Sequence, residues 1–252
     1  VHWVVTEYGA VNLHGLTVRE RAMALISVAH QKFRPWLLAE AKRLNFIYAD
    51  QLEPPVQVPV YPRQLETRAA TRDGTPLLIR PVRPTDESLL RDLFYRLSRE
   101  TVYHRFFGAK KFMPHASLQH FCTIDYDRDR TLVASVGSGG AGRSIGFGTY
   151  NVDERSGLAD TAYLVDDAWQ KRGIGTLLLR RLTEIAEARG VRGFSATVMR
   201  GNPAMLRVFA KCGYPVETRD HGDVVELRIS FEMPRDAWSS GAQPGDSHTS
   251  PS

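Results

Sequence analysis

Hydrophobic residues along positions 67–233 follow two patterns, short continuous runs and longer stretches in which they recur every three or four positions. Runs of the first kind are typical of strands, and they occur at 77–79, 131–136, 144–151, 161–165 and 194–198. Stretches of the second kind are typical of helices, and they occur between a Thr85 cap and Leu97, at 175–189 and at 203–212. A final pair of strands around 220–223 has the pattern of a closing hairpin. This mixed order predicts an α+β fold, a mixed sheet flanked by helices.

Composition divides the chain into four segments. Residues 1–50 predict a small α/β fragment, with a strand at 3–5 and two helices, the first opened by a capping box of Thr17 and Glu20. Residues 51–66 contain four prolines and predict an extended linker. Residues 67–233 form the main domain, and 234–252 is polar and predicts a disordered tail. Because the chain lacks an initiator methionine, we expect it to be the C-terminal piece of a longer protein.

Charge and cysteine content narrow the class of protein. Lys and Arg number 33 against 28 Asp and Glu, a net charge of +5 that suits an anionic ligand but not a nucleic-acid partner. No apolar run approaches the roughly 18 residues that span a bilayer, so no membrane partner is expected. Only Cys122 and Cys212 are present, which excludes a disulfide framework and favours a reducing compartment such as the cytoplasm.

The segment 170–175, Gln-Lys-Arg-Gly-Ile-Gly, lies between a predicted strand and a strongly amphipathic helix. Gly173 and Gly175 allow backbone amides to crowd together, and the helix start adds the positive end of its dipole. With Lys171 and Arg172 beside them, these groups predict an anion site suited to a pyrophosphate. The alternative is a tight strand-to-helix turn with no ligand. The spacing excludes a P-loop and a Rossmann fingerprint.

The same segment resembles the acyl-CoA signature of the GNAT superfamily of N-acetyltransferases, Gln/Arg-x-x-Gly-x-Gly/Ala, and Asn202 with Gly213-Tyr214 fits a later motif. The resemblance implies a sheet that splays beside the signature, with acetyl-CoA as co-substrate and direct transfer to an amine in a ternary complex. The cofactor-binding residues that it implies are Leu164, Val165, Gln170, Lys171, Arg172, Gly173, Ile174, Gly175, Thr176 and Asn202. An N-cap is an equal alternative for Asn202.

Residues 79–87 and 97–107 are similar to the opening of GNAT domains in bacterial protein lysine acetyltransferases, which implies a protein lysine as one candidate acceptor. In that group a Glu precedes the signature in an Ala-Glu-x-Ala context, and here Asp160 takes its place as the implied catalytic base. The alternative is an exposed strand-end acid after the Gly157 turn. The Tyr that often protonates the departing thiolate is replaced by Phe209, which carries no proton to donate.

Residues 1–50 resemble the C-terminal end of the acetyl-CoA hydrolase/transferase family of CoA-transferases. The nucleophilic Glu of that family has no counterpart here, so this part is incomplete, and the resemblance implies an upstream CoA-transferase domain as partner. The chain is therefore expected to derive from a fusion. The alternative to an enzyme is an acyl-CoA-sensing regulatory domain. No metal site is expected, because His115 and His120 are five positions apart and the cysteines lack ligand spacing.

Overall fold

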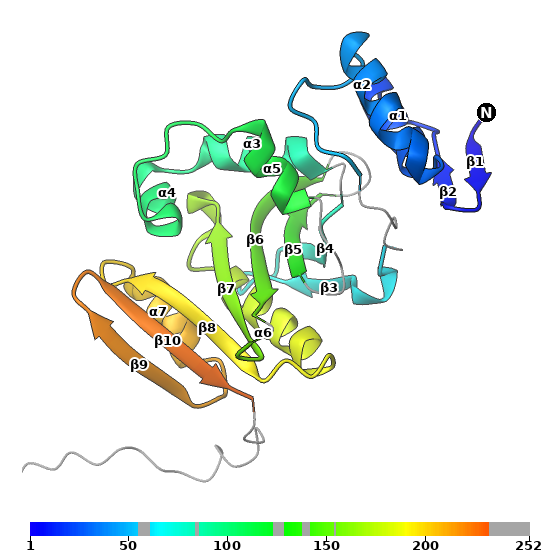
Figure 1. Ribbon diagram of the computed structural model, residues 1–252. Helices are drawn as coiled ribbons and strands as arrows, with labels where there is room; N and C mark the ends of the chain where they lie inside the picture. Colours follow the sequence, from blue (N-terminus) through cyan, green and yellow to red (C-terminus); the bar gives the residue numbers. More distant parts are fainter. Residues whose placement is uncertain (55–60, 84–85, 123–128, 138–141, 154, 232–252) are drawn as a thin grey trace, which may run out of the picture.

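The computed structural model describes residues 1–54, 61–83, 86–122, 129–137, 142–153 and 155–231. The predicted tail 234–252 and the Thr85 cap lie outside these residues. Two units are visible in Figure 1, a small N-terminal unit in blue and a larger domain built on one sheet. In the described part of the chain, every helix is too short or too polar to cross a membrane.

The N-terminal unit packs an antiparallel hairpin, β1 (Trp3–Thr6) and β2 (Gly9–Asn12), beside the helices α1 (Val18–Ser27) and α2 (Arg34–Arg43). The predicted capping box of α1 is present, since Thr17 and Glu20 bond each other's backbone amides. The second strand was not predicted. It forms because Gly9, with φ of 140°, lets the chain turn back within two residues.

The main domain is an eight-stranded sheet with the order β3-β4-β5-β6-β7-β8-β10-β9. Its strands are β3 (Thr67–Ala70), β4 (Pro76–Pro81), β5 (Asp129–Val136), β6 (Arg143–Val152), β7 (Leu158–Val165), β8 (Gly193–Met199), β9 (Val216–His221) and β10 (Val224–Ser230). Neighbouring strands run antiparallel except β7 and β8, which run parallel. The expected α+β class, a mixed sheet flanked by helices, is confirmed.

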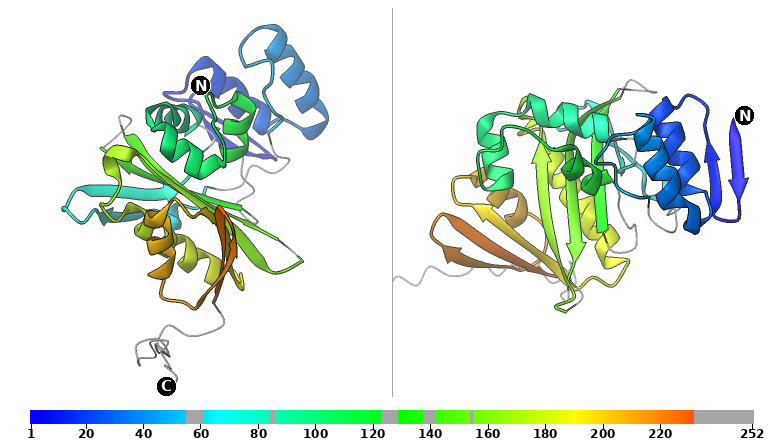
Figure 2. Two further views of the ribbon diagram at one scale, coloured as in Figure 1. Left: turned by 90° about the vertical axis from the view of Figure 1, so that its left-hand side faces the viewer. Right: turned by 45° about the horizontal axis from the view of Figure 1, so that its top comes forward.

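Helices cover both faces of this sheet (Figure 2). One face carries α3 (Glu87–Arg96), α4 (Arg99–Phe106) and α5 (His115–Cys122), and the other carries α6 (Ile174–Glu187) and α7 (Pro203–Ala210). Each layer buries its own apolar core against the sheet. The apolar positions of α6 recur at helical spacing and are almost fully buried, namely Ile174, Leu178, Leu182 and Ile185.

A polar junction joins the two units. The ring of His115 on α5 lies 2.8 Å from the Asp50 carboxylate and 3.0 Å from that of Glu87 on α3. The Leu52 amide donates to the side chain of Gln119 at 2.7 Å. His115 and the first residues of the predicted linker are thus used to hold the N-terminal unit against α5.

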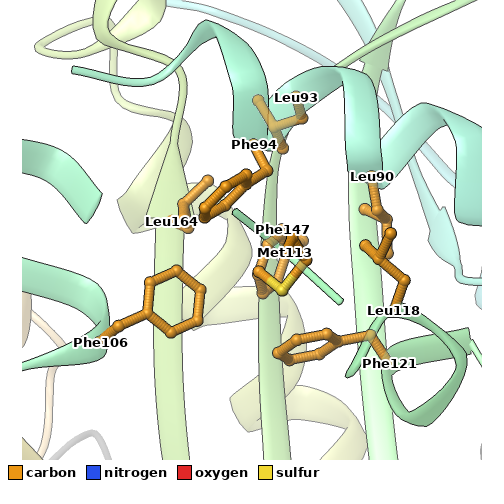
Figure 3. A pocket seen from close by; sticks show the side chains of 9 residues that line it. All are labelled: Leu90, Leu93, Phe94, Phe106, Met113, Leu118, Phe121, Phe147 and Leu164. Atoms are coloured by element: carbon orange, nitrogen blue, oxygen red, sulfur yellow. The ribbon is translucent and has the colours of Figure 1, made fainter. Parts of the chain in front are cut away.

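The core beneath α3, α4 and α5 encloses a small cavity, whose lining is drawn in Figure 3. Its volume is about 10 Å³, room for no more than one water. The lining side chains are all apolar, and Phe94, Phe106 and Phe147 are among them. A water needs polar partners, so this cavity is a packing gap and not a ligand site.

Candidate active site

The two parallel strands at the centre of the sheet separate along their length. β7 pairs with β8 only over Leu158–Asp160, opposite Gly193–Ser195. Beyond Asp160 the two strands continue without pairing with each other, and β8, β10 and β9 lean away from β7 in Figure 1. A cleft of about 840 Å³ opens there, between β7, β8, α4, α6 and α7. Its size lies within the range of cofactor sites.

The loop between β7 and α6 forms one end of the cleft. Gly173 caps α6 with φ of 90°, and Lys171 also has a positive φ of 62°. Within the described residues, the backbone amides of 171–176 donate to no acceptor. A cluster of free amides at the start of a helix of 14 residues is suited to an anionic group such as a pyrophosphate.

The side chains predicted in this loop have different surroundings. Gln170 braces the loop, since its Nε2 donates to Thr101 Oγ1 at 3.0 Å and to the Val165 carbonyl at 3.3 Å. Arg172 points away from the cleft and pairs with Asp73 at 3.0 Å. Lys171 is exposed and lines the cleft. Of the two basic side chains of the signature, that of Lys171 lines the cleft and that of Arg172 does not. Arg172 as a cofactor contact stays a prediction, through its free backbone amide.

The other predicted contacts line the same cleft. Leu164 and Val165 belong to the part of β7 that has no partner in β8. Ile174 is buried, so it offers its backbone amide rather than its side chain. Asn202 caps α7, because its Oδ1 accepts the Met205 amide at 3.0 Å, and it lines the cleft as well. Gly175 and Thr176 lie at the first turn of α6 and also line it.

Asp160 lies within β7, opposite Asn151 on β6, at the last position paired with β8. The alternative reading, an exposed acid at a strand end after the Gly157 turn, fits its exposure and its place as the third residue of a strand that begins at Leu158, so the role of Asp160 as a base stays a prediction. Its carboxylate is open to the cleft, yet the protein on its other sides raises its pKa by burial, and the charge of Arg105 on α4 opposes that rise.

Arg105 faces this carboxylate from the opposite wall. Burial lowers the pKa of its guanidinium, and its Nε has no hydrogen-bond partner among the described residues. The guanidinium carbon lies 5.1 Å from the centre of the Phe106 ring. The pair of Asp160 and Arg105 therefore forms a charged centre where the two strands separate.

Three basic residues of the cleft were not predicted from the sequence, Arg72, Arg207 and Lys211. Arg72 comes from the turn between β3 and β4, far from the signature in the chain, and no motif marks it. Phe209, in place of the usual Tyr, is buried with its ring centre 5.8 Å from that of Tyr163. Burial raises the pKa of the Tyr163 phenol, which favours its protonated form.

Comparison with known proteins identifies the larger domain. Residues 94–214 match the family model described as Acetyltransferase (GNAT) family. An acetyltransferase of Pseudomonas aeruginosa is 31% identical over 155 residues, which are 62% of this chain and 83% of that protein. The chain belongs to the GNAT acetyltransferase family. It is an acetyl-CoA-dependent N-acetyltransferase, as the signature loop indicated.

Two further relatives of the acetyltransferase support this result. The crystal structure of the GNAT domain of S. lividans PAT has a TM-score of 0.63 and 28% identity, over 68% of this chain and 99% of that one. Acetyltransferase Pat of Mycolicibacterium smegmatis is 30% identical over 61% of this chain, which spans only 46% of that protein. The expected splayed GNAT fold is thereby confirmed.

The N-terminal unit of the acetyltransferase has separate relatives. Residues 1–41 match the model of the acetyl-CoA hydrolase/transferase C-terminal domain. The 4-hydroxybutyrate coenzyme A transferase of Clostridium kluyveri is 56% identical over 43 residues, which are 17% of this chain and 10% of that protein. The expected resemblance of this short segment to the C-terminal end of a CoA-transferase is confirmed.

Proposed function

We propose that this acetyltransferase moves the acetyl group of acetyl-CoA directly to a primary amine, in particular the side chain of a protein lysine. The observation that carries the proposal is the position of Asp160 in one continuous cleft with the amide cluster of the signature loop. A donor held by the loop and an amine held beside Asp160 would then meet where β7 and β8 separate.

The cleft fits acetyl-CoA at its phosphate end. The free amides of 171–176, the side chain of Lys171 and the left-handed Gly173 provide an anion cradle that a side chain at Gly173 would obstruct. The unpaired edge of β7, at Leu164 and Val165, offers backbone groups to the pantetheine amides. When bound, acetyl-CoA supplies an acyl group activated as a thioester.

Asp160 is the proposed general base. A lysine amine is protonated at neutral pH and reacts only after losing a proton, and the Asp160 carboxylate would accept it. A carboxylate with a raised pKa is a better base than an ordinary one. Because aspartate is one methylene shorter than the glutamate of the resembling group, we expect the proton to travel through a water.

The departing thiolate has no proton donor at the usual position. Phe209 has no ionisable group and is 1% exposed. A thiolate, whose conjugate acid has a pKa of about 8.5, leaves without a proton donor and is protonated by water afterwards. We therefore infer that water, and no side chain of α7, protonates the leaving group.

The acceptor side of the cleft suits a cationic side chain on a large partner. Glu100 and Asp160 both line the cleft, so it offers two carboxylates to an incoming ammonium. Tyr103 on α4 and Phe107, which caps its C-terminal end, are about half exposed, at 46% and 47%. Aromatic residues at the mouth of a charged cleft are typical of protein-recognition surfaces. We also propose that the protein acts in a reducing compartment, the cytoplasm, because its two cysteines, Cys122 and Cys212, are free thiols.

The test is amine-dependent release of CoA thiol from acetyl-CoA, with lysine peptides, polyamines and free amino acids as acceptors. We expect lysine peptides to be preferred, and Asp160→Asn to lower kcat by about 100- to 10,000-fold with acetyl-CoA affinity unchanged. The matched control is Asp153→Asn, since Asp153 lies in a surface turn outside the cleft. Equal activity of Asp160→Asn and wild type would remove Asp160 from the mechanism. Binding of acetyl-CoA without any acetylated amine would instead favour the acyl-CoA-sensing alternative.

For the N-terminal unit we propose a CoA-transferase domain as partner. Its likeness to the end of such domains coincides with large exposed apolar side chains, among them Trp3 at 60%, Val5 at 72% and Trp36 at 64%. Such a surface needs a cover. A CoA-transferase lacking its own last segment should bind this chain in a titration, and Trp3→Ser with Trp36→Ser should weaken that binding. No binding of the wild-type chain would contradict the proposal.

A further inference from the structure

The turn between β3 and β4, residues 71–75, lies directly against the signature loop. The Arg72 amide donates to the Arg172 carbonyl at 3.0 Å, and the Asp73 carboxylate accepts from the Arg172 guanidinium at 3.0 Å. The turn is itself well fixed, because the Thr71 amide donates to the Thr75 carbonyl at 3.0 Å. Turn and loop are thus joined by one backbone bond and one ion pair.

Asp73 determines which arginine faces the cleft. The Thr71 hydroxyl bonds its carboxylate, as does that of Thr75, and these bonds hold the pKa of Asp73 below its usual range. The anionic Asp73 then keeps Arg172 outside the cleft, where its guanidinium also lies 4.8 Å from the centre of the Trp169 ring. The Arg172 side chain is therefore already paired, with Asp73.

Arg72 lies on the cleft side of the same turn. Its side chain runs along Gly173, with Cγ 3.4 Å and Nε 3.5 Å from the position that a Cβ on Gly173 would take. It lines the cleft, and within the described residues its guanidinium has no ion-pair or hydrogen-bond partner. An unpaired cation thus borders the free amides at the start of α6.

We propose that Arg72 binds the pyrophosphate of acetyl-CoA from beside Gly173, and that the β3–β4 turn extends the phosphate site next to the signature loop. A guanidinium forms strong charge-assisted hydrogen bonds with phosphate oxygens. Arg72 provides a positive charge at the cleft, while Asp73 pairs with the Arg172 side chain outside it. The inference deepens the proposed function, but it rests only on acetyl-CoA as donor and not on any acceptor.

The experiment is calorimetric titration of the full chain with CoA and with dephospho-CoA, which lacks the 3′-phosphate, in the absence of acceptor. We expect Arg72→Ala to weaken both ligands equally, by about tenfold, as for one lost charge-assisted contact. Arg72→Lys should recover part of the loss. The control is Arg68→Ala, which removes the same charge from exposed β3 outside the cleft and should leave both affinities unchanged.

Other outcomes would overturn the assignment. Unchanged affinity in Arg72→Ala would show that the turn does not contact the phosphates. Loss with CoA alone would place Arg72 at the 3′-phosphate instead. An equal loss of affinity for pantetheine, which has no phosphate, would mean a general disturbance of the cleft. If the wild-type chain binds neither CoA nor dephospho-CoA, the donor assignment itself fails, a result distinct from an effect confined to Arg72.

Discussion

The two glycines of the signature loop should respond to alanine with opposite signs. Gly173 has φ of 90°, a conformation that an L side chain adopts at a cost of roughly 1–2 kcal/mol. An added Cβ would also lie 3.4 Å from Arg72 Cγ, although that side chain can move. Gly173→Ala should therefore lower the free energy of unfolding by about 1–2 kcal/mol.

Gly175 lies in the first turn of α6 and has no positive φ. A Cβ there would meet nothing closer than Val208 Cγ2 at 3.6 Å, an ordinary van der Waals contact. Alanine in a helix is more stable than glycine by about 0.5–1 kcal/mol. Gly175→Ala should therefore raise the free energy of unfolding by up to that amount.

The two substitutions add the same methyl group two residues apart, so each is the control for the other. Their difference is about 1.5–3 kcal/mol, which urea denaturation followed by circular dichroism resolves readily. Gly173→Ala should also weaken CoA binding, because the free amides of the loop depend on its left-handed backbone. If Gly175→Ala proved as destabilising as Gly173→Ala, the conformational argument for the loop would be refuted.

Three further predictions concern the core and the base. Asp86→Ala should cost about 3–5 kcal/mol in urea denaturation, because Arg80, which bonds it at 2.6 and 2.8 Å, would remain buried and unpaired; near-native stability would contradict this. Because burial raises the pKa of Asp160, the rate should rise with pH through a value above that of an ordinary aspartate. A flat pH–rate profile would argue against Asp160 as the base. Because the folded state disfavours the ionised Asp160, the free energy of unfolding of the wild type should fall as pH rises through the same range, and Asp160→Asn should abolish that fall. Gly193→Ala should lower the Tm markedly, because its Cβ would lie 2.1 Å from the Ile229 carbonyl oxygen, and a tolerated alanine would disprove that contact.

Local signals in the sequence were sufficient for the donor side of the cleft. The strand, the glycines and the amphipathic helix of 161–189 depend on neighbours in the chain, and the structure contains all three. The positions of the basic side chains could not be predicted from these local signals. Nothing in the sequence predicts that the side chain of Arg72, and not that of Arg172, lines the cleft. The difference arises in the fold, which brings the Asp73 carboxylate close to Arg172, with which it pairs outside the cleft.

The helix α4 was not predicted because its own signals are weak. Val102 is its only buried residue, so no amphipathic pattern marks it. It is held instead by a distant residue, since the Asp167 carboxylate accepts from the amide and the hydroxyl of Ser98, both at 2.7 Å. β3 was missed for a similar reason, because Thr67–Ala70 has no apolar run and forms a strand by pairing with β4.

Thr101 connects α4, on the acceptor side of the cleft, to the segment that precedes the signature loop. Its hydroxyl donates to Asp167 at 2.7 Å and accepts from Gln170 at 3.0 Å, so one side chain of α4 touches both ends of the segment before the signature glycines. The helix that carries Arg105 is thereby fixed to the signature loop. The geometry of the signature loop can thus determine the position of a cleft wall more than 60 positions earlier in the chain. Gln170 lines the cleft, where its contact with the cofactor stays a prediction, and its side chain also links the two walls.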